Sequence, residues 1–436
     1  MPSSIPEGQP NVLVFFTDQQ RWDTAGIYGN PLDLTPNFDA FAQAGTLFEY
    51  AFTCQPVCGP ARSAIQTGLY ATQNGCFRNG IPLPMALPTL ATWFGNAGYD
   101  TGYIGKWHLA SRDPVPVDEQ GGYQYWLAAN TLEFTSEPYH TVVFDREGNP
   151  QKLPGYRVDA LVDAAIRFVA APRERPFFLF VSLLEPHHQN RRDNYPAPDV
   201  YRTRYAGRWM PADLAALGGD AHQHIGGYYG MVRRLDEAFG RILDALKSLG
   251  ISDNTAVVYT SDHGNHFRTR NGEYKRSVHD SSIRIPLAAG GGPFRGGGTI
   301  RQLVSLIDLA PSLLDAAGIL QSGLSGRSVL PLVRRRKVFW PEEVFVQVSE
   351  SQVGRAVRTE RWKYGVRAAD KDGWNDCSSD EYVEDMLYDL EADPHELNNL
   401  LGRRDYLPVT QNMRERLIAR MLEAGESKPK IVQGGD

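Results

Sequence analysis

The sequence predicts an α/β fold: a large mixed, mostly parallel β-sheet sandwiched by helices, followed by a smaller C-terminal α+β subdomain. Short, nearly continuous runs of β-branched and aromatic residues predict strands that are buried on both faces. Amphipathic helical patterns alternate with these runs, which is typical of a doubly wound sheet. Each run also stops at polar residues, and ligands of such sheets bind at the carboxyl ends of the strands.

Four runs are the expected central strands, at residues 11–17, 101–105, 177–184 and 255–261. The polar residues that follow them are, in order, Asp18-Gln19, Lys106-Trp107-His108, Glu185-Pro186-His187-His188 and Asp262-His263. Because parallel strands have their carboxyl ends at one edge of a sheet, we expect these groups to lie near one another.

Helical spacing of apolar residues predicts the helices that separate the strands. It is found at residues 34–44, 158–169, 231–249 and 307–317. The glycine-rich residues 290–298 are expected to form a surface loop.

The pattern changes near residue 340, where long buried runs give way to short strands and tight turns. We expect strands at residues 344–349, 356–359 and 362–366, and a terminal helix at residues 409–423. Residues 387–400 are interpreted as a strand, an Asp-Pro turn and a short helix. The chain is therefore expected to have an N-terminal domain at residues 1–340 and a C-terminal subdomain with a small antiparallel sheet at residues 341–436.

The composition is that of a folded protein and excludes several functional classes. The 436 residues are 42% hydrophobic and 22% charged, which excludes wholesale disorder. The net charge of −6 argues against a nucleic-acid binder that relies on bulk charge. No apolar run approaches the ~18 residues that cross a bilayer, so we expect no membrane partner.

The location in the cell is predicted from the N-terminus and from cysteine usage. The first residues, MPSSIPEGQP, lack the basic and apolar regions of a secretory signal, so a cytoplasmic protein is expected, or a periplasmic or secreted one if a signal has been removed. The cysteines are Cys54, Cys58, Cys76 and Cys377. They are too few for a secreted disulfide scaffold, which fits a reducing compartment and leaves a reactive or modified thiol open.

The sharpest local feature is the pentapeptide Cys58-Gly59-Pro60-Ala61-Arg62. Proline favours the first turn of a helix, so Cys58 is expected at a helix N-terminus, where free N–H groups and the dipole favour anions. Arg62 lies one turn further on and can point at the same anion. The spacing from cysteine to arginine is too short for the phosphate loop of cysteine-dependent phosphatases. The alternatives are a buried structural cysteine, or a metal pair with Cys54, for which no further ligands at zinc spacing are present.

The spacing Cys58-x-Pro60-x-Arg62 resembles the signature of type I sulfatases of the alkaline phosphatase superfamily, in which the cysteine is oxidised to Cα-formylglycine. Further motifs occur in the family's order: Asp18-Gln19, Thr35-Pro36-Asn37, Gly105-Lys106-Trp107-His108, Pro186-His187, Ser261-Asp262-His263-Gly264, Lys275 and residues 387–400. The resemblance covers most of the chain. It implies the sulfatase fold, a catalytic domain at residues 1–340, and a formylglycine-generating enzyme as the partner in maturation.

The resemblance also implies a divalent cation, usually calcium. Asp18 and Asp262 match the carboxylate ligands, and Gln19, His263 and residue 58 are the further ligands. Many family members instead carry two adjacent aspartates after the first strand and an asparagine after the second-site aspartate, whereas phosphonate monoester hydrolases and choline-sulfatases share the variation found here. Oxygen ligands suit Ca²⁺ or Mg²⁺ and imidazole favours Mn²⁺, so Ca²⁺ is expected with Mn²⁺ and Mg²⁺ open. Taken alone, either aspartate is more often an ordinary strand-end or capping residue.

Sulfate-ester cleavage requires neutralisation of the sulfuryl oxygens and an activated oxygen nucleophile. The resemblance implies that hydrated formylglycine supplies a geminal diol, one hydroxyl of which is acidified by the metal and attacks sulfur. The expected catalytic residues are Cys58, Arg62, Lys106, His108, His187 and Lys275. The three cations are expected to hold sulfuryl oxygens or the nucleophile. His187 or a charged neighbour is expected to protonate the leaving oxygen, and His108 to act as the base.

Weaker candidates for substrate binding are His188, Arg276 and His279. The catalytic candidates also have ordinary alternatives when each is taken alone. A lone lysine such as Lys106 or Lys275 is most often solvated at the surface, and His108 beside Trp107 can be a core histidine.

The sequence therefore predicts a sulfatase, a sulfuric ester hydrolase, that acts on an organic sulfate monoester. The 8 Trp, 20 Tyr and 19 Phe include rings on which sugars can stack, so a carbohydrate or glycan fragment is the expected substrate. Two alternatives stay open. One is a phosphonate or phosphate ester hydrolase of the same superfamily, which Asp18-Gln19 and Asp262-His263 keep open. The other is a catalytically silent binding protein in which Cys58 stays unmodified.

Overall fold

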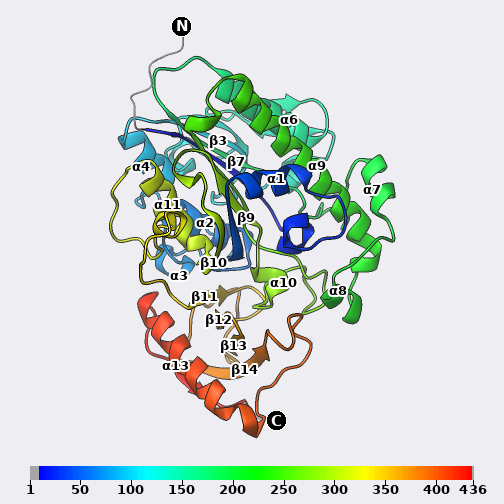
Figure 1. Ribbon diagram of the computed structural model, residues 1–436, viewed down its shortest axis with the longest axis vertical. Coiled ribbons are helices and arrows are strands. Elements are labelled where there is room, and N and C mark those ends of the chain that lie inside the picture. Colours follow the sequence, from blue (N-terminus) through cyan, green and yellow to red (C-terminus); the bar gives the residue numbers. More distant parts are fainter. Residues whose placement is uncertain (1–8, 435–436) are drawn as a thin grey trace.

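Two β-sheets organise the protein, which was analysed as a computed structural model that describes residues 9–434 (Figure 1). The larger sheet has ten strands in the order β10-β2-β9-β8-β1-β7-β3-β4-β5-β6. Their bounds are β1 (Asn11–Thr17), β2 (Thr46–Phe52), β3 (Asp100–Lys106), β4 (Tyr125–Ala129), β5 (Thr141–Phe144), β6 (Pro150–Leu153), β7 (Phe177–Ser182), β8 (Thr255–Ser261), β9 (Leu287–Gly290) and β10 (Gly298–Ser305). The expected α/β fold is confirmed.

The centre of the large sheet is parallel and the strands towards its edges are mixed. Strands β8, β1, β7, β3 and β4 run parallel, whereas β9, β5 and β6 pair antiparallel with their neighbours. In the register, Phe16 lies opposite Ser182 of β7 and Thr260 of β8. The three central strands therefore end at the same level, and the residues after them meet at one edge of the sheet.

Helices cover both faces of this sheet, because alternate strand residues point to opposite sides. Val12, Val14 and Phe16 pack against α2, α4, α11 and α12 on one face. Leu13 and Phe15 pack against α1, α6 and α9 on the other. The two sets lie on either side of the strands in Figure 1. The helices are α1 (Pro36–Ala44), α2 (Cys58–Thr67), α3 (Ala71–Asn74), α4 (Leu90–Asn96), α5 (Leu132–Thr135), α6 (Arg157–Ala170), α7 (Asp199–Tyr205), α8 (Ala212–Ala216), α9 (Ala221–Ser248), α10 (Asp280–Ile283), α11 (Leu309–Ala316), α12 (Leu330–Val333) and α13 (Leu407–Glu423).

The smaller sheet is built from the C-terminal part of the chain and lies at the bottom of Figure 1. Its strands, in spatial order, are β11 (Glu343–Val348), β12 (Gly354–Thr359), β13 (Trp362–Arg367), β14 (Glu381–Asp389) and β15 (Lys430–Val432). Only the pairing of β14 with β15 is parallel. Helix α13 packs on one face through Met413, Leu417 and Met421. The other face shares a core with Phe52 and Leu303 of the large sheet, which joins the two sheets.

Two expected elements differ from the structure. Helix α9 begins at Ala221 rather than near residue 231. Its first turns contain glycines, which allow close packing: a Cβ at Gly227 would lie 2.3 Å from the carbonyl oxygen of Tyr195. The helix expected within residues 387–400 is absent, because side chains bind the backbone there instead. Asn398 donates its N–H to Asp393, and Asn399 accepts the N–H of Leu387.

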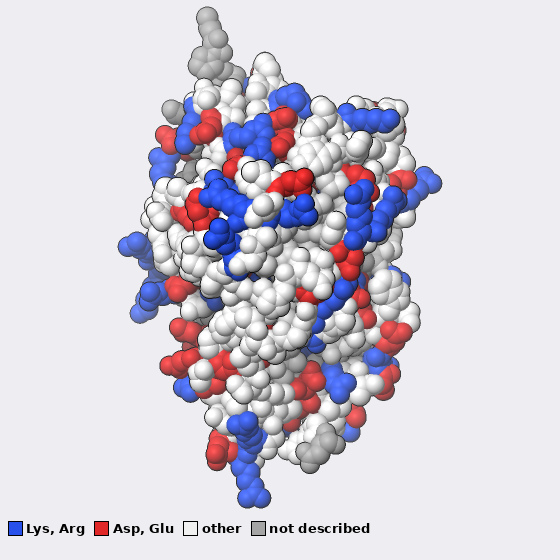
Figure 2. Space-filling model, turned by 90° about the vertical axis from the view of Figure 1, so that its right-hand side faces the viewer, with Lys and Arg blue, Asp and Glu red and all other residues white. Residues whose placement is uncertain are grey.

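Charges of both signs are interspersed on the face that carries α7 and α9 (Figure 2). Ion pairs along these helices include Arg202–Asp199 and Arg233–Glu237. The first of these pairs is exposed, and exposed pairs contribute little to stability, about 0–1 kcal/mol each. Among the described residues, no helix combines the length and the apolar character that a bilayer span requires.

Candidate active site

The site lies where the central strands end and α2 begins. Strand pairing continues one residue beyond β1, since Asp18 donates its N–H to the carbonyl of Glu185 at 3.2 Å. Asp262 likewise donates its N–H to Thr17 at 3.2 Å. These two bonds place the aspartates side by side. The first turn of α2 brings Cys58 over them from the face covered by α2 and α4.

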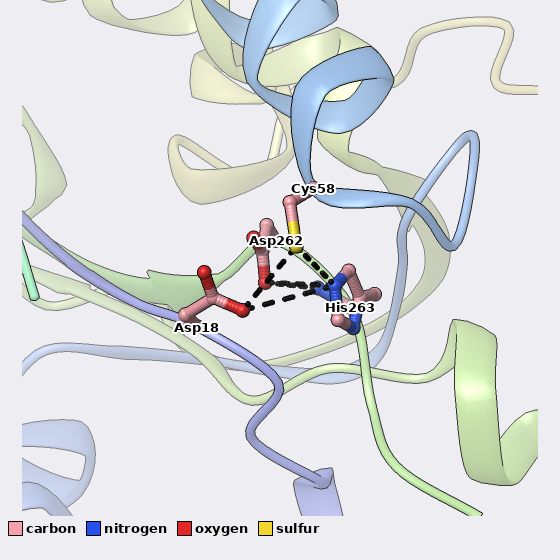
Figure 3. Close-up of side chains that lie close together, drawn as sticks. All are labelled: Asp18, Cys58, Asp262 and His263. Atoms are coloured by element: carbon pink, nitrogen blue, oxygen red, sulfur yellow. Dashed lines mark hydrogen bonds and ion pairs between the residues drawn. The ribbon is translucent and has the colours of Figure 1, made fainter. Parts of the chain in front are cut away.

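Four buried side chains converge here: Asp18, Cys58, Asp262 and His263 (Figure 3). One ligand atom from each lies within 4.8 Å of all the others. The Sγ of Cys58 is 3.3 Å from His263 Nε2 and 3.6 Å from Asp18 Oδ1. His263 Nδ1 lies 2.9 Å from the carbonyl of Gly264. A carbonyl only accepts, so Nδ1 carries a proton, and Nε2 faces the other three side chains.

The chemistry of this donor set fits a divalent cation. It offers two carboxylates and an imidazole nitrogen. Gln19 donates its backbone N–H to Asp262 Oδ1 at 3.0 Å, and its amide oxygen is buried and has no hydrogen-bond partner among the described residues. Gln19 Nε2 is directed to Tyr195 Oη at 3.4 Å, which leaves the amide oxygen free. Burial and the charge of Asp18 raise the pKa of Asp262, because two carboxylates this close repel each other. A cation would relieve that repulsion.

Three buried cations, Arg62, Lys106 and Lys275, surround the cluster. Arg62 Nη2 lies 2.9 Å from Asp18 Oδ2 and 3.2 Å from Asp262 Oδ2. Lys106 Nζ lies 2.9 Å from Asp18 Oδ2. Burial would raise the pKa of Asp18, yet Lys106, His187 and Arg62 together hold it below its usual range. Asp18 therefore stays ionised, and a bound cation would add the positive charge that an anionic group needs here.

Lys275 and Lys106 also act on residue 58. Lys275 Nζ lies 2.8 Å from Cys58 Sγ and 3.2 Å from His187 Nε2. Burial would raise the pKa of the Cys58 thiol, but Lys106, Lys275 and His263, with a hydrogen bond from His108, hold it well below its ordinary value. The surroundings of residue 58 therefore stabilise negative charge on its side chain.

The remaining candidates near Lys275 are His187, His188 and Arg276. His187 Nδ1 donates to the carbonyl of His188 at 2.7 Å, which turns its Nε2 towards Lys275. His188 stacks on His187 with ring centroids 4.4 Å apart, and its pKa is lowered by burial and by His187. Arg276 follows Lys275 and pairs with Glu273 at 2.8 Å.

His279 does not join this group of side chains. It lies against Ser277 and Tyr388, 3.2 and 3.3 Å away, at the contact with the smaller sheet. Its position along the chain, close behind Lys275, suggested a place in the site. The intervening backbone instead turns towards the C-terminal subdomain, where Asp280 starts α10.

Sequence reasoning missed Glu133, which lies in α5 in a segment without a motif. Its side chain is buried, and its Oε1 is 3.0 Å from Lys106 Nζ, so this lysine is held between Glu133 and Asp18. Burial would raise the pKa of Glu133, but Lys106 and His108 lower it to about 2. Only the fold places a carboxylate from α5 beside the end of β3.

We expect Glu133 to make stability depend on pH in the acid range. Its pKa falls from an ordinary 4.5 to about 2 on folding, so its contribution is fully present above 4.5 and is lost as the pH falls towards 2. Between about pH 6 and about pH 3.5, the free energy of unfolding of the wild type should fall by about 1 kcal/mol more than that of Glu133→Gln. Urea denaturation at both pH values measures this difference, and equal losses in the two proteins would contradict it.

Comparison with known proteins gives consistent matches along the chain. Residues 10–319 match the family described as Sulfatase, and residues 272–423 match the family described as N-sulphoglucosamine sulphohydrolase, C-terminal. An ulvan-active sulfatase of Formosa agariphila is 28% identical, over 96% of this chain and 82% of that protein. An N-acetylglucosamine-6-O-sulfatase of Bacteroides thetaiotaomicron is 25% identical, over 93% and 85%. The crystal structure of a phosphonate monoester hydrolase of Agrobacterium radiobacter has the same fold, with a TM-score of 0.76, 24% identity and coverage of 95% and 96%.

Proposed function

The chain belongs to the sulfatase family, and from this we propose that it hydrolyses sulfate monoesters of carbohydrates or glycan fragments with a formylglycine formed from Cys58 and a divalent cation. One observation carries the proposal: Asp18, Asp262, His263 and residue 58 converge within 4.8 Å, and buried cations surround them. Such a site can bind a metal ion and a tetrahedral anion together.

Cysteine Sγ marks where the oxygens of a hydrated formylglycine would lie. When present, that group and a bound cation would together supply an ionised oxygen nucleophile. We propose that Asp18, Gln19, Asp262 and His263 hold the cation, together with residue 58. Calcium is the expected metal because most of these donors are oxygens, and the imidazole keeps Mn²⁺ and Mg²⁺ open.

The other charged residues would act on the sulfuryl group and on proton transfer. We propose that Arg62, Lys106 and Lys275 neutralise the sulfuryl oxygens, which is supported by their burial around residue 58. His187 Nε2 lies beside Lys275 and can give a proton to the leaving oxygen. His108 is the proposed base, which is supported by its lowering of the pKa of the Cys58 thiol.

A carbohydrate substrate is supported by the relatives named above, one active on ulvan and one on N-acetylglucosamine 6-O-sulfate groups. Residues beyond the reacting group would contact the sugar. His188 and Arg276 are the proposed contacts, since both are partly exposed next to catalytic candidates. The position of His279 gives it no support in this role.

Two measurements on protein purified from its native host test the proposal. Steady-state rates on p-nitrophenyl sulfate, choline sulfate and a panel of defined sulfated mono- and disaccharides should show turnover, fastest on a saccharide. Activity only on a phosphonate monoester would instead support the second candidate, which the donors Gln19 and His263 favour. Mass spectrometry of the peptide that contains residue 58 should show an aldehyde, and a thiol throughout would support a silent binding protein.

A further inference from the structure

The end of β11, in the smaller sheet, lies against the segment that carries residue 58. Gln347 donates its N–H to the carbonyl of Cys54 at 2.9 Å. Gln55 Nε2 donates to Ser349 Oγ at 2.8 Å. The C-terminal subdomain therefore contacts the chain immediately before the nucleophile position.

Glu350 follows these contacts and is the buried acid of this junction. Its side chain is 2% exposed, and its backbone φ of 66° lies in the left-handed region, which costs a residue other than glycine about 1–2 kcal/mol. Its Oε1 accepts the N–H of Asn79 at 2.7 Å, and its Oε2 forms an ion pair with Arg276. A buried charge in a strained backbone persists only where its surroundings hold it there.

Both partners of Glu350, Asn79 and Arg276, contact the segment around residue 58. Asn79 Oδ1 accepts the N–H of Gly59 at 2.9 Å, next to residue 58. Arg276, also in the left-handed region with φ of 68°, donates its N–H to Pro56 at 3.2 Å. The carbonyl of Arg276 accepts Ser351 Oγ at 2.7 Å. Arg276 adjoins Lys275, whose Nζ contacts Cys58 Sγ.

We propose that Glu350 is a positioning residue for the reaction. This proposal rests on the proposed function above. It fixes Arg276 and, through it, the backbone of Lys275 on one side of residue 58, and it fixes Asn79 and Gly59 on the other. The C-terminal subdomain thereby sets the distance between Lys275 and the nucleophile. Removal of its charge loosens Lys275 without removing any group that touches the substrate.

Glu350→Gln tests this proposal, because glutamine keeps the shape and can still accept from Asn79 but cannot pair with Arg276. We expect kcat on p-nitrophenyl sulfate to fall about 10- to 100-fold, as small displacements of catalytic groups do, with KM changed less than about threefold. Glu384→Gln is the matched control. Glu384 is also a buried acid of this subdomain, paired with Arg414 at 2.6 Å, but it contacts the smaller sheet and α13. Its loss should lower the melting temperature and leave kcat unchanged.

A double-mutant cycle with Arg276→Gln separates positioning from a general structural role. If Glu350 acts through Arg276, Glu350→Gln should change kcat by less than about twofold in the Arg276→Gln background. The proposal would be overturned if Glu350→Gln changed kcat equally in both backgrounds or left kcat unchanged. It would also be overturned if Glu384→Gln lowered kcat as much as Glu350→Gln. If Glu350→Gln does not fold, Ser351→Ala takes its place, with an expected loss in kcat of about threefold, and an unchanged kcat would then be decisive. A wild-type protein inactive on every sulfate ester would instead refute the proposed function.

Discussion

Cys58→Ala is expected to abolish sulfate-ester turnover, with a loss in kcat of at least about 10⁴-fold, while the protein stays folded. Alanine keeps Cβ but lacks the thiol whose oxidation would convert that carbon into the aldehyde. The fold should tolerate it, because residue 58 is the first residue of α2 and alanine is a good helix former. Assays on p-nitrophenyl sulfate with circular dichroism and thermal denaturation measure both parts of this result.

Cys54→Ala is the matched control for this substitution. Cys54 is equally buried and lies in the same segment, but its side chain packs with Ala64 and Ile307 rather than with the charged cluster. The control should keep wild-type kcat with at most a modest loss of stability. Substantial sulfate release by Cys58→Ala would refute a reaction through residue 58.

Asp262→Asn is expected to release the metal ion and to lower kcat by about 10³-fold. Asp262 Oδ1 accepts the N–H groups of Gln19 and His263, and its Oδ2 faces Arg62. Asparagine can keep the first two bonds only by turning its NH₂ group towards the guanidinium, which also only donates. Metal content measured by plasma mass spectrometry and activity should therefore fall together.

Asp236→Asn controls for the loss of a buried carboxylate. Asp236 accepts the N–H groups of Asn37 and Phe38 at the start of α1, on the opposite face of the sheet. This variant should lose stability but keep metal and kcat. For the wild type, chelation followed by addition of Ca²⁺, Mn²⁺ or Mg²⁺ should restore activity best with Ca²⁺. Wild-type metal content in Asp262→Asn would contradict the ligand assignment.

The parts of the site that the sequence predicts are those that follow strand ends. Asp18, Lys106 and Asp262 come directly after buried runs, and parallel pairing alone brings such positions to one edge. Lys275 and His187 could be named through family motifs. Their mutual contact at 3.2 Å depends on loop conformations that no periodicity describes.

The residues that sequence reasoning missed depend on packing between distant segments. Glu133 reaches Lys106 because α5 follows β4, which pairs with β3. Glu350 meets Asn79 and Arg276 because a shared core docks the smaller sheet on the larger one. His279 is close to Lys275 along the chain, which suggested a shared site. Its contacts, however, are with Ser277 and Tyr388.

The hydrogen bonds between residues 347–351 and the segment around Cys58 affect when the thiol can be oxidised. In the finished protein this side chain is only 1% exposed, so a second enzyme has no access to it. The thiol would be accessible before the strands of the smaller sheet have been synthesised or have paired, as on a nascent chain. Oxidation of Cys58 would then compete kinetically with folding. Molecules that fold before oxidation would keep an unmodified thiol.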